Sequence, residues 1–290
     1  MGSKNLGAPV DRLEDARLVM GKGRYVDDIK LPGTLSAAFL RSPEAHAKIT
    51  SLDLSAARAL PGVVAVYALQ DLGAVAQKRM LQSYPNPAIK IDITQFPLAK
   101  DEVCFVGEPI AVVIATDRYL AEDGVQAIEL ELESLPCVID ARDALKPNAA
   151  RVQQAFESNL AATMNWKFGD IEQAFADADH VFEEDYFQHR GAPHYMECRG
   201  VLAQFDSAMQ RLRIWSSTQS PFLVRRFLAA YLEREEFNIH VIAPDVGGGF
   251  GPKAVHYPEE LVIAIAAEKI GQPVKWIEDR RENFVSSNQQ

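Results

Sequence analysis

Hydrophobic and polar residues follow one another along this chain in patterns that predict strands and helices in mixed order. Short apolar or alternating runs bounded by Gly, Pro or Asp are typical of strands, and longer runs with apolar residues three or four positions apart are typical of helices. These patterns predict strands over residues 35–40, 63–69, 110–115, 129–133, 182–188, 201–206, 212–217, 239–244 and 274–277. They predict helices over residues 53–60, 118–127 and 258–270, and further helices that begin at Pro221 and Asp279.

The mixed order of these elements indicates an α+β protein with two domains. We expect a polar, extended arm over residues 1–20, a first domain over 21–140, a linker over 141–165 and a second domain over 166–290. The first predicted helix of the second domain carries an apolar stripe at helical spacing, which we expect to pack in the core. The stripe consists of Phe222, Leu223, Phe227, Leu228, Tyr231 and Leu232.

Composition and charge exclude several classes of protein. The chain has 290 residues, 48% of them hydrophobic, and its net charge is −10. Without a Lys/Arg cluster, we expect neither nucleic-acid binding nor binding to an anionic membrane. No run of about 18 apolar residues occurs, and residues 1–15 lack the apolar core of a secretory signal. Cys104, Cys137 and Cys198 lie too far apart to hold an iron–sulfur cluster or a Cys-rich zinc site alone, and they favour a reducing cytoplasm.

The candidate chemistry lies in a glycine-rich turn between the strand over 239–244 and the helix over 258–270. Residues 246–253 have the sequence Val-Gly-Gly-Gly-Phe-Gly-Pro-Lys. Glycine adopts positive φ easily and lets main-chain N–H groups approach a ligand closely. A strand, a glycine-rich turn and a helix N-terminus commonly hold an anionic group, and the ring of Phe250 can stack on a flat ligand. We therefore predict a cofactor site, with a tight turn that binds nothing as the alternative.

Two familiar nucleotide motifs do not fit the spacing of this turn. A Walker A loop requires Ser or Thr directly after its lysine, but Ala254 follows Lys253. A dinucleotide fingerprint requires a glycine three positions after Gly249, and Pro252 occupies that position. A nucleotide-binding α/β protein is therefore a disfavoured alternative.

Gln219 is a second candidate because it lies at the end of a predicted strand, where α/β domains bind ligands. Its amide can donate and accept hydrogen bonds without a charge, although on position alone the simpler interpretation is that it caps the following helix. His189, His194 and Glu197 lack the spacing of helical zinc ligands, because Gly and Pro lie between the histidines. We favour a structural cluster there. No general base stands out, and no Gly-x-Ser-x-Gly elbow occurs.

Short motifs of glycine, proline and charged residues lie at residues 23–33, 41–47, 107–113, 135–140, 217–221, 246–253 and 274–282. Together they resemble the molybdopterin-binding large subunit of the xanthine dehydrogenase/aldehyde oxidase family, which includes aerobic carbon monoxide dehydrogenase. The first four motifs resemble the start and end of the family's α/β hammerhead domain, and the last three resemble its first molybdenum-cofactor motifs and the segment directly after them. The resemblance implies an α+β fold with a hammerhead domain followed by the first part of the molybdenum-cofactor-binding domain.

The resemblance also implies roles for individual residues. Gln219 would contact an oxygen ligand of molybdenum, backbone groups around Gly248, Gly249 and Gly251 would hold the cofactor, and Phe250 would hold it too while facing the substrate. The implied reaction is hydroxylation of an aldehyde, an N-heterocycle or carbon monoxide, with water as the oxygen source. Electrons would pass to iron–sulfur clusters and FAD on small and medium partner subunits of a cytoplasmic hetero-oligomer. By analogy with bacterial relatives, we expect the cytosine dinucleotide form of molybdopterin.

Two departures from the family pattern narrow these expectations. Purine-specific relatives usually carry Glu after the motif lysine, and Ala254 therefore argues against xanthine as the substrate. Asp279 and Glu282 form a capping box that opens a helix, yet the chain stops at Gln290. We therefore expect a catalytic base beyond Gln290, supplied by a separate C-terminal molybdopterin-domain chain. The alternative is a truncated or split, non-catalytic cofactor-binding or assembly protein that is inactive alone.

Overall fold

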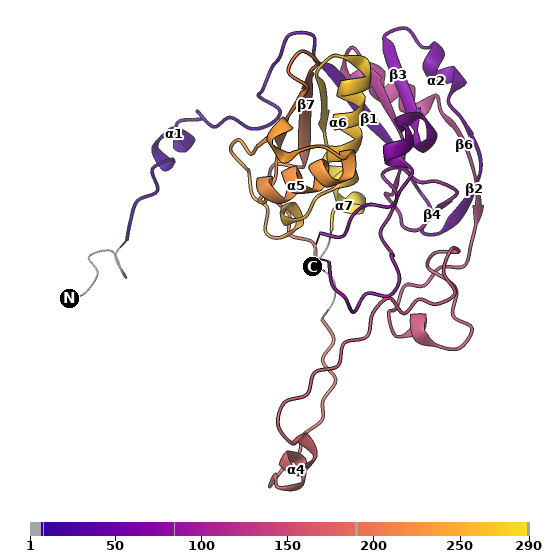
Figure 1. Ribbon diagram of the computed structural model, residues 1–290, viewed down its shortest axis with the longest axis vertical. Helices are drawn as coiled ribbons and strands as arrows, with labels where there is room; N and C mark the ends of the chain where they lie inside the picture. Colours follow the sequence, from indigo (N-terminus) through magenta and orange to yellow (C-terminus); the bar gives the residue numbers. More distant parts are fainter. Residues whose placement is uncertain (1–6, 8, 84, 189–190, 289–290) are drawn as a thin grey trace.

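The computed structural model describes residues 7–288 apart from residues 8, 84, 189 and 190 (Figure 1). Its body consists of two sheets and the helices packed against them. The strands are β1 Leu35–Arg41, β2 Ala47–Asp53, β3 Val63–Ala68, β4 Glu102–Val103, β5 Pro109–Ala115, β6 Glu129–Ser134, β7 Gly200–Asp206, β8 Arg211–Ser216, β9 Ile239–Ile242 and β10 Val274–Ile277. The helices are α1 Asp15–Val19, α2 Ser55–Ala59, α3 Arg118–Gln126, α4 Ile171–Ala176, α5 Pro221–Leu232, α6 Pro258–Ile270 and α7 Arg280–Ser286.

Seven strands form the larger sheet, in the order β3-β5-β1-β10-β7-β8-β9. β1 pairs with β10 and β8 pairs with β9 in parallel, and the other neighbours are antiparallel. The β1–β10 pair aligns Leu35 with Val274 and Ala37 with Trp276. Strands from residues 21–140 and strands from residues 166–290 therefore share one sheet. The smaller sheet has the order β4-β2-β6.

Local patterns account for the elements of the first half. β5 is buried at every position, which is why its sequence is continuously apolar. The predicted half-exposed strand is β6, in which partly buried and exposed residues alternate at its start. Asp117 caps α3, because its side chain accepts the N–H of Leu120 at 3.0 Å. These three predictions are confirmed.

α6 is the central helix of the second half, and it packs on β7, β8 and β10. Every residue from Pro258 to Ala267 is buried. The all-round apolar sequence predicts this for Val262 to Ala267, but not for Glu259 and Glu260. Gly271 ends the helix with φ of 74°. Asp279 caps α7 by accepting the N–H of Glu282 at 2.7 Å, which confirms the predicted capping box. No helix in the described part of the chain is both long and apolar enough to cross a bilayer.

Several element predictions are wrong. Residues 182–188 form no strand, because this segment of aromatic and acidic residues finds no neighbouring strand to pair with and lies exposed on a projecting arm, residues 164–188 (Figure 1). Phe222 is 75% exposed and so does not belong to the core stripe, whereas Phe227 is 4% exposed. The N-terminal segment expected to be extended contains the helix α1. β2 and β4 were not predicted, since their mixed polar sequences give little periodicity.

Candidate functional site

The glycine-rich turn forms a tight loop that leads from β9 to α6 through a short 3-10 helix over Pro252–Ala254. The φ angles are 96° at Gly248, 50° at Phe250 and 107° at Gly251. Glycine adopts these values without strain, but a phenylalanine with positive φ is uncommon and strained. Strain of this kind is often found where a backbone must hold a ligand or a side chain in a set position.

Gln219 lies between β8 and α5, and its side chain packs directly on the glycine loop. Its Oε1 accepts the N–H of Gly251 at 3.0 Å, and its main-chain N–H donates to the carbonyl oxygen of Lys253 at 2.8 Å. A Cβ atom on Gly249 would lie 2.5 Å from Gln219 Oε1 and 2.6 Å from Cδ. The amide of Gln219 is therefore directed to the glycine loop. Its hydrogen bond does not support the alternative that it caps α5.

The arrangement of donors around the loop fits an oxygen-rich or anionic group. Gly249 is buried, and the N–H groups of Gly248 and Gly249 meet no protein acceptor among the described residues. Because Gly251 occupies Oε1 of Gln219, the Nε2 group of that amide is left to donate. An oxygen-rich or anionic group can approach such a backbone closely, because no Cβ atoms block it and the N–H groups of Gly248 and Gly249 can donate.

Phe250 lies at the outer surface of this loop. It is 63% exposed, and a Cβ on Gly248 would lie 2.9 Å from Phe250 Cε2. The ring therefore leans over Gly248, where only a glycine leaves room for it. This position suits contact with a ligand that approaches the loop from outside.

Beneath the loop, Lys253, Glu197 and Ser217 form a polar cluster. The Lys253 side chain is buried, and its Nζ donates to Glu197 Oε2 at 3.1 Å and to Ser217 Oγ at 2.7 Å. Burial lowers the pKa of Lys253, and the negative charge of Glu197 opposes that shift. In the sequence, Glu197 stands out only as a possible metal ligand. The one local signal for this cluster is the lysine that comes just after the glycine turn.

A buried network of charges fixes the N-terminal end of α6 behind the loop. Arg199 donates to Glu278 at 2.9 Å and to Glu259 at 3.2 Å. Arg41, at the end of β1, donates to the same Glu259 at 2.6 Å. The guanidinium of Arg199 also lies 3.9 Å from the ring centroid of Tyr257, the residue before α6. These charge-assisted pairs hold α6 against the large sheet.

The histidines singled out in the sequence do not lead to a metal site in the described structure. His189 lies outside the described residues. The ring of His194 packs edge-on against Phe284 at 5.3 Å, and Glu197 belongs to the lysine cluster. Among the residues that the structure describes, no group of three or more His, Cys, Asp or Glu could hold a metal ion.

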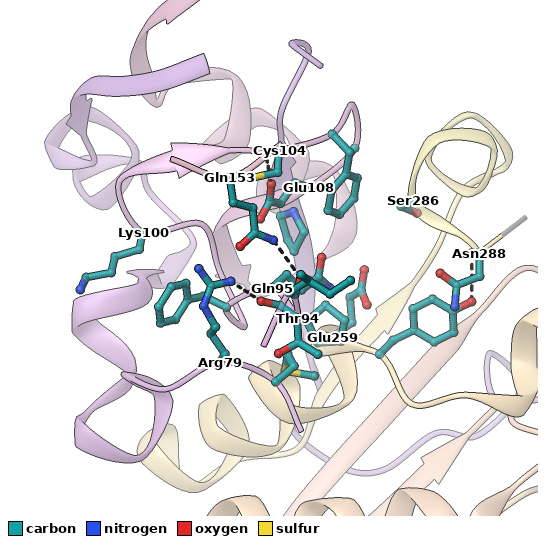
Figure 2. A pocket seen from close by; sticks show the side chains of 18 of the residues that line it. Arg79, Thr94, Gln95, Lys100, Cys104, Glu108, Gln153, Glu259, Ser286 and Asn288 are labelled. Carbon is teal, nitrogen blue, oxygen red and sulfur yellow. Dashed lines mark hydrogen bonds between the residues drawn. The ribbon is translucent and has the colours of Figure 1, made fainter. Parts of the chain in front are cut away.

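A separate cavity of about 850 Å³ opens between the loop region that carries Arg79 and Lys100 and the C-terminal end of α7, which carries Ser286 (Figure 2). Inside it, the N–H of Cys104 donates to Glu108 at 2.6 Å. Burial raises the pKa of Glu108 to about 7 and that of Cys104 to about 12. No residue of the glycine loop lines this cavity, so it is distinct from the candidate site.

Comparison with known families defines the class of protein. Residues 20–136 match the family profile described as aldehyde oxidase and xanthine dehydrogenase, a/b hammerhead domain. Residues 152–290 match the profile described as molybdopterin cofactor-binding domain. The fold is thus an α/β hammerhead domain followed by part of a molybdopterin cofactor-binding domain, as the resemblance implied.

Full-length relatives agree with these profiles. The chain is 40% identical over 283 residues to the nicotine 6-hydroxylase large subunit of Paenarthrobacter nicotinovorans, covering 98% of this chain and 34% of that subunit. It is 36% identical to the carbon monoxide dehydrogenase large chain of Afipia carboxidovorans, covering 98% of this chain and 36% of that one. The chain therefore belongs to the aldehyde oxidase/xanthine dehydrogenase family. It corresponds to part of the molybdopterin-binding large subunit. It spans about a third of the length of these relatives.

Solved structures show the same relationship. Quinoline 2-oxidoreductase from Pseudomonas putida 86 superposes with a TM-score of 0.87 at 38% identity, and reconstituted CO dehydrogenase from Oligotropha carboxidovorans with a TM-score of 0.88 at 35% identity. In both cases the match covers 98% of this chain and 36% of the other.

Proposed function

We propose that this chain is part of the molybdopterin-binding subunit of a molybdenum hydroxylase. Its substrate would be an aldehyde, an N-heterocycle or carbon monoxide, hydroxylated with water as the source of oxygen. The contact of Gln219 with the glycine loop is the observation that supports this most directly, because it brings two separate segments together as one set of uncharged donors. Two of the relatives named above are a nicotine 6-hydroxylase subunit and a carbon monoxide dehydrogenase chain, and their names support an N-heterocycle or carbon monoxide as the substrate.

Within this proposal, the loop would hold the cofactor through Gly248, Gly249, Phe250 and Gly251. Gln219 would donate from Nε2 to an oxygen of the cofactor, because Gly251 already occupies its Oε1. The exposed ring of Phe250 would face the substrate. When bound, the molybdenum cofactor supplies the redox centre and the activated oxygen. We propose the cytosine dinucleotide form of the pterin.

The catalytic base is proposed to lie outside these residues. Glu197 is the carboxylate that contacts the loop, but one of its oxygens accepts from Gly247, Ser217 and Lys253. All three donors come from the loop and its supporting cluster, so this carboxylate is engaged with the protein and not directed to a ligand. Glu197 therefore supports the loop.

The partners follow from the same proposal. Iron–sulfur clusters and FAD would be held by small and medium subunits of a cytoplasmic hetero-oligomer, since this chain has only three widely spaced cysteines. We also propose that the part corresponding to the remaining length of the relatives covers the projecting arm. The arm exposes large aromatic side chains that a soluble surface rarely leaves uncovered. They are Trp166, Phe168, Phe175, Phe182, Tyr186 and Phe187.

The test uses the complex that the tagged chain forms in its native host. Molybdenum, iron and FAD are measured per copy of the chain. We expect stoichiometric molybdenum in the wild type and its loss in Gly249→Val, because a β-branched side chain there would displace Gln219. Gly191→Val is the matched control, since nothing lies within 4 Å of a Cβ at that position.

Either of two results would contradict the proposal. One is a wild-type complex without molybdenum, and the other is unchanged molybdenum in Gly249→Val. A turnover assay of the loaded complex with aldehydes, N-heterocycles and carbon monoxide would then identify the substrate class.

A further inference from the structure

The lysine cluster beneath the glycine loop joins both segments of the proposed cofactor site. Glu197 Oε2 accepts the N–H of Gly247 at 2.8 Å, and the carbonyl oxygen of Gly247 accepts the N–H of Glu197 at 3.2 Å. On the other side, the carbonyl oxygen of Lys253 accepts the N–H of Gln219 at 2.8 Å. The start of the loop is thus fixed by Glu197, and the backbone of Gln219 is fixed by Lys253.

The two side chains connect these fixed points. Lys253 Nζ donates to the carbonyl oxygen of Glu197 at 2.7 Å and to its Oε2 at 3.1 Å. Ser217, on the strand side, accepts from Nζ at 2.7 Å and donates to the same Oε2 at 2.7 Å. The ammonium also lies 4.5 Å from the ring centroid of Tyr195, a favourable cation–π distance. Every donor of the Lys253 ammonium is therefore directed into this cluster.

The burial of this cluster makes its geometry strict. Lys253 is 1% exposed, and Ser217 is 4% exposed. If the carboxylate is removed, the buried ammonium is left as an uncompensated charge in a low dielectric, and the carboxylate is left unpaired if the ammonium is removed. The surrounding structure then moves to reduce that cost. Close packing leaves little room for such movement, because a Cβ on Gly247 would lie 2.5 Å from Glu197 Cβ. A displaced Glu197 side chain would therefore displace the loop.

We propose that Glu197 and Lys253 are positioning residues for the molybdenum cofactor. They act through the loop backbone and through the main chain of Gln219, without touching the cofactor themselves. This inference rests on the proposed function, since it concerns the same site. An ion pair with a buried ammonium and a partly exposed carboxylate would thus set the distance between Gln219 and the loop donors.

The test measures molybdenum per chain in the complex from the native host, together with the thermal midpoint of each variant. We expect Glu197→Leu and Lys253→Met to lower molybdenum content roughly tenfold, because each removes hydrogen bonds to a charged group and leaves its partner unpaired. Glu197→Gln should lose less molybdenum than Glu197→Leu, because its amide oxygen still accepts hydrogen bonds from donors that now meet Oε2, although the charge that pairs with Lys253 is gone. Ser217→Ala keeps the ion pair and should lose less molybdenum than Glu197→Gln.

Arg41→Met is the matched control for stability. Arg41 is buried to a similar degree and pairs with Glu259 and Glu282 at 2.6 Å each, but it contacts neither the loop nor Gln219. We expect this variant to lower the thermal midpoint and to keep its molybdenum. The outcome that overturns the inference is a loss of molybdenum in Arg41→Met that matches its fall in thermal midpoint in the same proportion as in Glu197→Leu and Lys253→Met. The cluster would then be merely structural.

The outcomes separate this inference from the proposed function. Full molybdenum in Glu197→Leu and Lys253→Met, with loss in Gly249→Val, overturns only the positioning role. Full molybdenum in Gly249→Val overturns the proposed function itself. If Glu197→Leu or Lys253→Met does not accumulate, the molybdenum content of Ser217→Ala relative to Glu197→Gln still decides the matter. A higher content in Ser217→Ala supports the inference, and the reverse order contradicts it.

Discussion

At the scale of single residues, α6 places two neighbouring glutamates in different surroundings. Glu259 pairs with Arg41 and Arg199, whereas Glu260 accepts only from Ser216 Oγ at 2.6 Å and from the N–H of Tyr257 at 3.1 Å. Glu260 is 4% exposed, and burial raises its pKa to about 7, opposed by these two hydrogen bonds. Burial outweighs the two hydrogen bonds and the more distant charge of Arg199, and therefore favours the protonated carboxyl.

This pKa shift predicts a pH dependence of stability. Between pH 4.5 and about 7, the folded state keeps the Glu260 proton that the unfolded chain has released. The free energy of unfolding therefore falls as pH rises through that window, by up to roughly 3 kcal/mol from this group, and then levels off. Glu260→Gln cannot ionise, so its stability relative to the wild type should rise between about pH 5 and about pH 8.

Denaturant unfolding of the purified chain at the two pH values measures this difference. Glu268→Gln, a partly exposed position on the same helix, is the matched control and should follow the wild type. Other shifted groups, such as Glu108 and His256, are common to all three proteins and cancel. A wild type and a Glu260→Gln variant with parallel pH profiles would contradict the assignment.

At the scale of elements, α5 shows how far a periodic stripe determines packing. Phe227 packs inward, where its ring stacks on His256 at 3.6 Å and meets Tyr231 at 5.6 Å. Phe222, one turn and a half earlier, is exposed beside Arg225. The apolar stripe includes both Phe222 and Phe227. Only the packing of α5 on β9 decides which of the two rings is buried in the core.

The two phenylalanines make a matched pair for stability. We expect Phe227→Ala to lower the free energy of unfolding by about 3–5 kcal/mol, since it removes a buried ring and leaves a cavity. Phe222→Ala should change it by less than about 0.5 kcal/mol. Equilibrium unfolding of both variants measures the two changes. Equal losses of the free energy of unfolding would contradict the exposed position of Phe222.

At the scale of the whole molecule, the two family domains are joined by main-chain and side-chain contacts. The parallel β1–β10 pair continues the sheet from one to the other, and the ring of Phe39 meets Trp276 edge-on at 5.5 Å across it. Arg41 on β1 pairs with Glu282 of α7 at 2.6 Å. A shared sheet with a shared core is expected to unfold as one unit.

Calorimetry tests this cooperativity. We expect a single transition for the purified chain, with calorimetric and van't Hoff enthalpies that agree. Arg41→Met should lower the midpoint without splitting the transition. Two resolved transitions in the wild type would mean that the hammerhead and cofactor-binding parts fold separately despite the common sheet.

The site shows the boundary between local and tertiary information. The sequence marked Gln219 and the glycine turn as separate candidates, with no sign that Gln219 packs on Gly249. The partners of Lys253 were likewise invisible, because Glu197 lies more than fifty residues before it in the chain. Which polar residue meets a loop over such a separation depends on how β7, β8 and α6 are stacked, and no local pattern encodes that.

The sequence alone determined the features that depend on interactions between residues close together in the chain. The buried β5, the all-round apolar α6, the caps at Asp117 and Asp279 and the positive-φ glycine turn each depend on burial period or on hydrogen bonds within a few positions. Only the tertiary structure decided the β1–β10 junction, the exposure of the projecting arm and the Lys253–Glu197 cluster. These depend on which distant segments meet, and that is fixed by packing the whole chain at once.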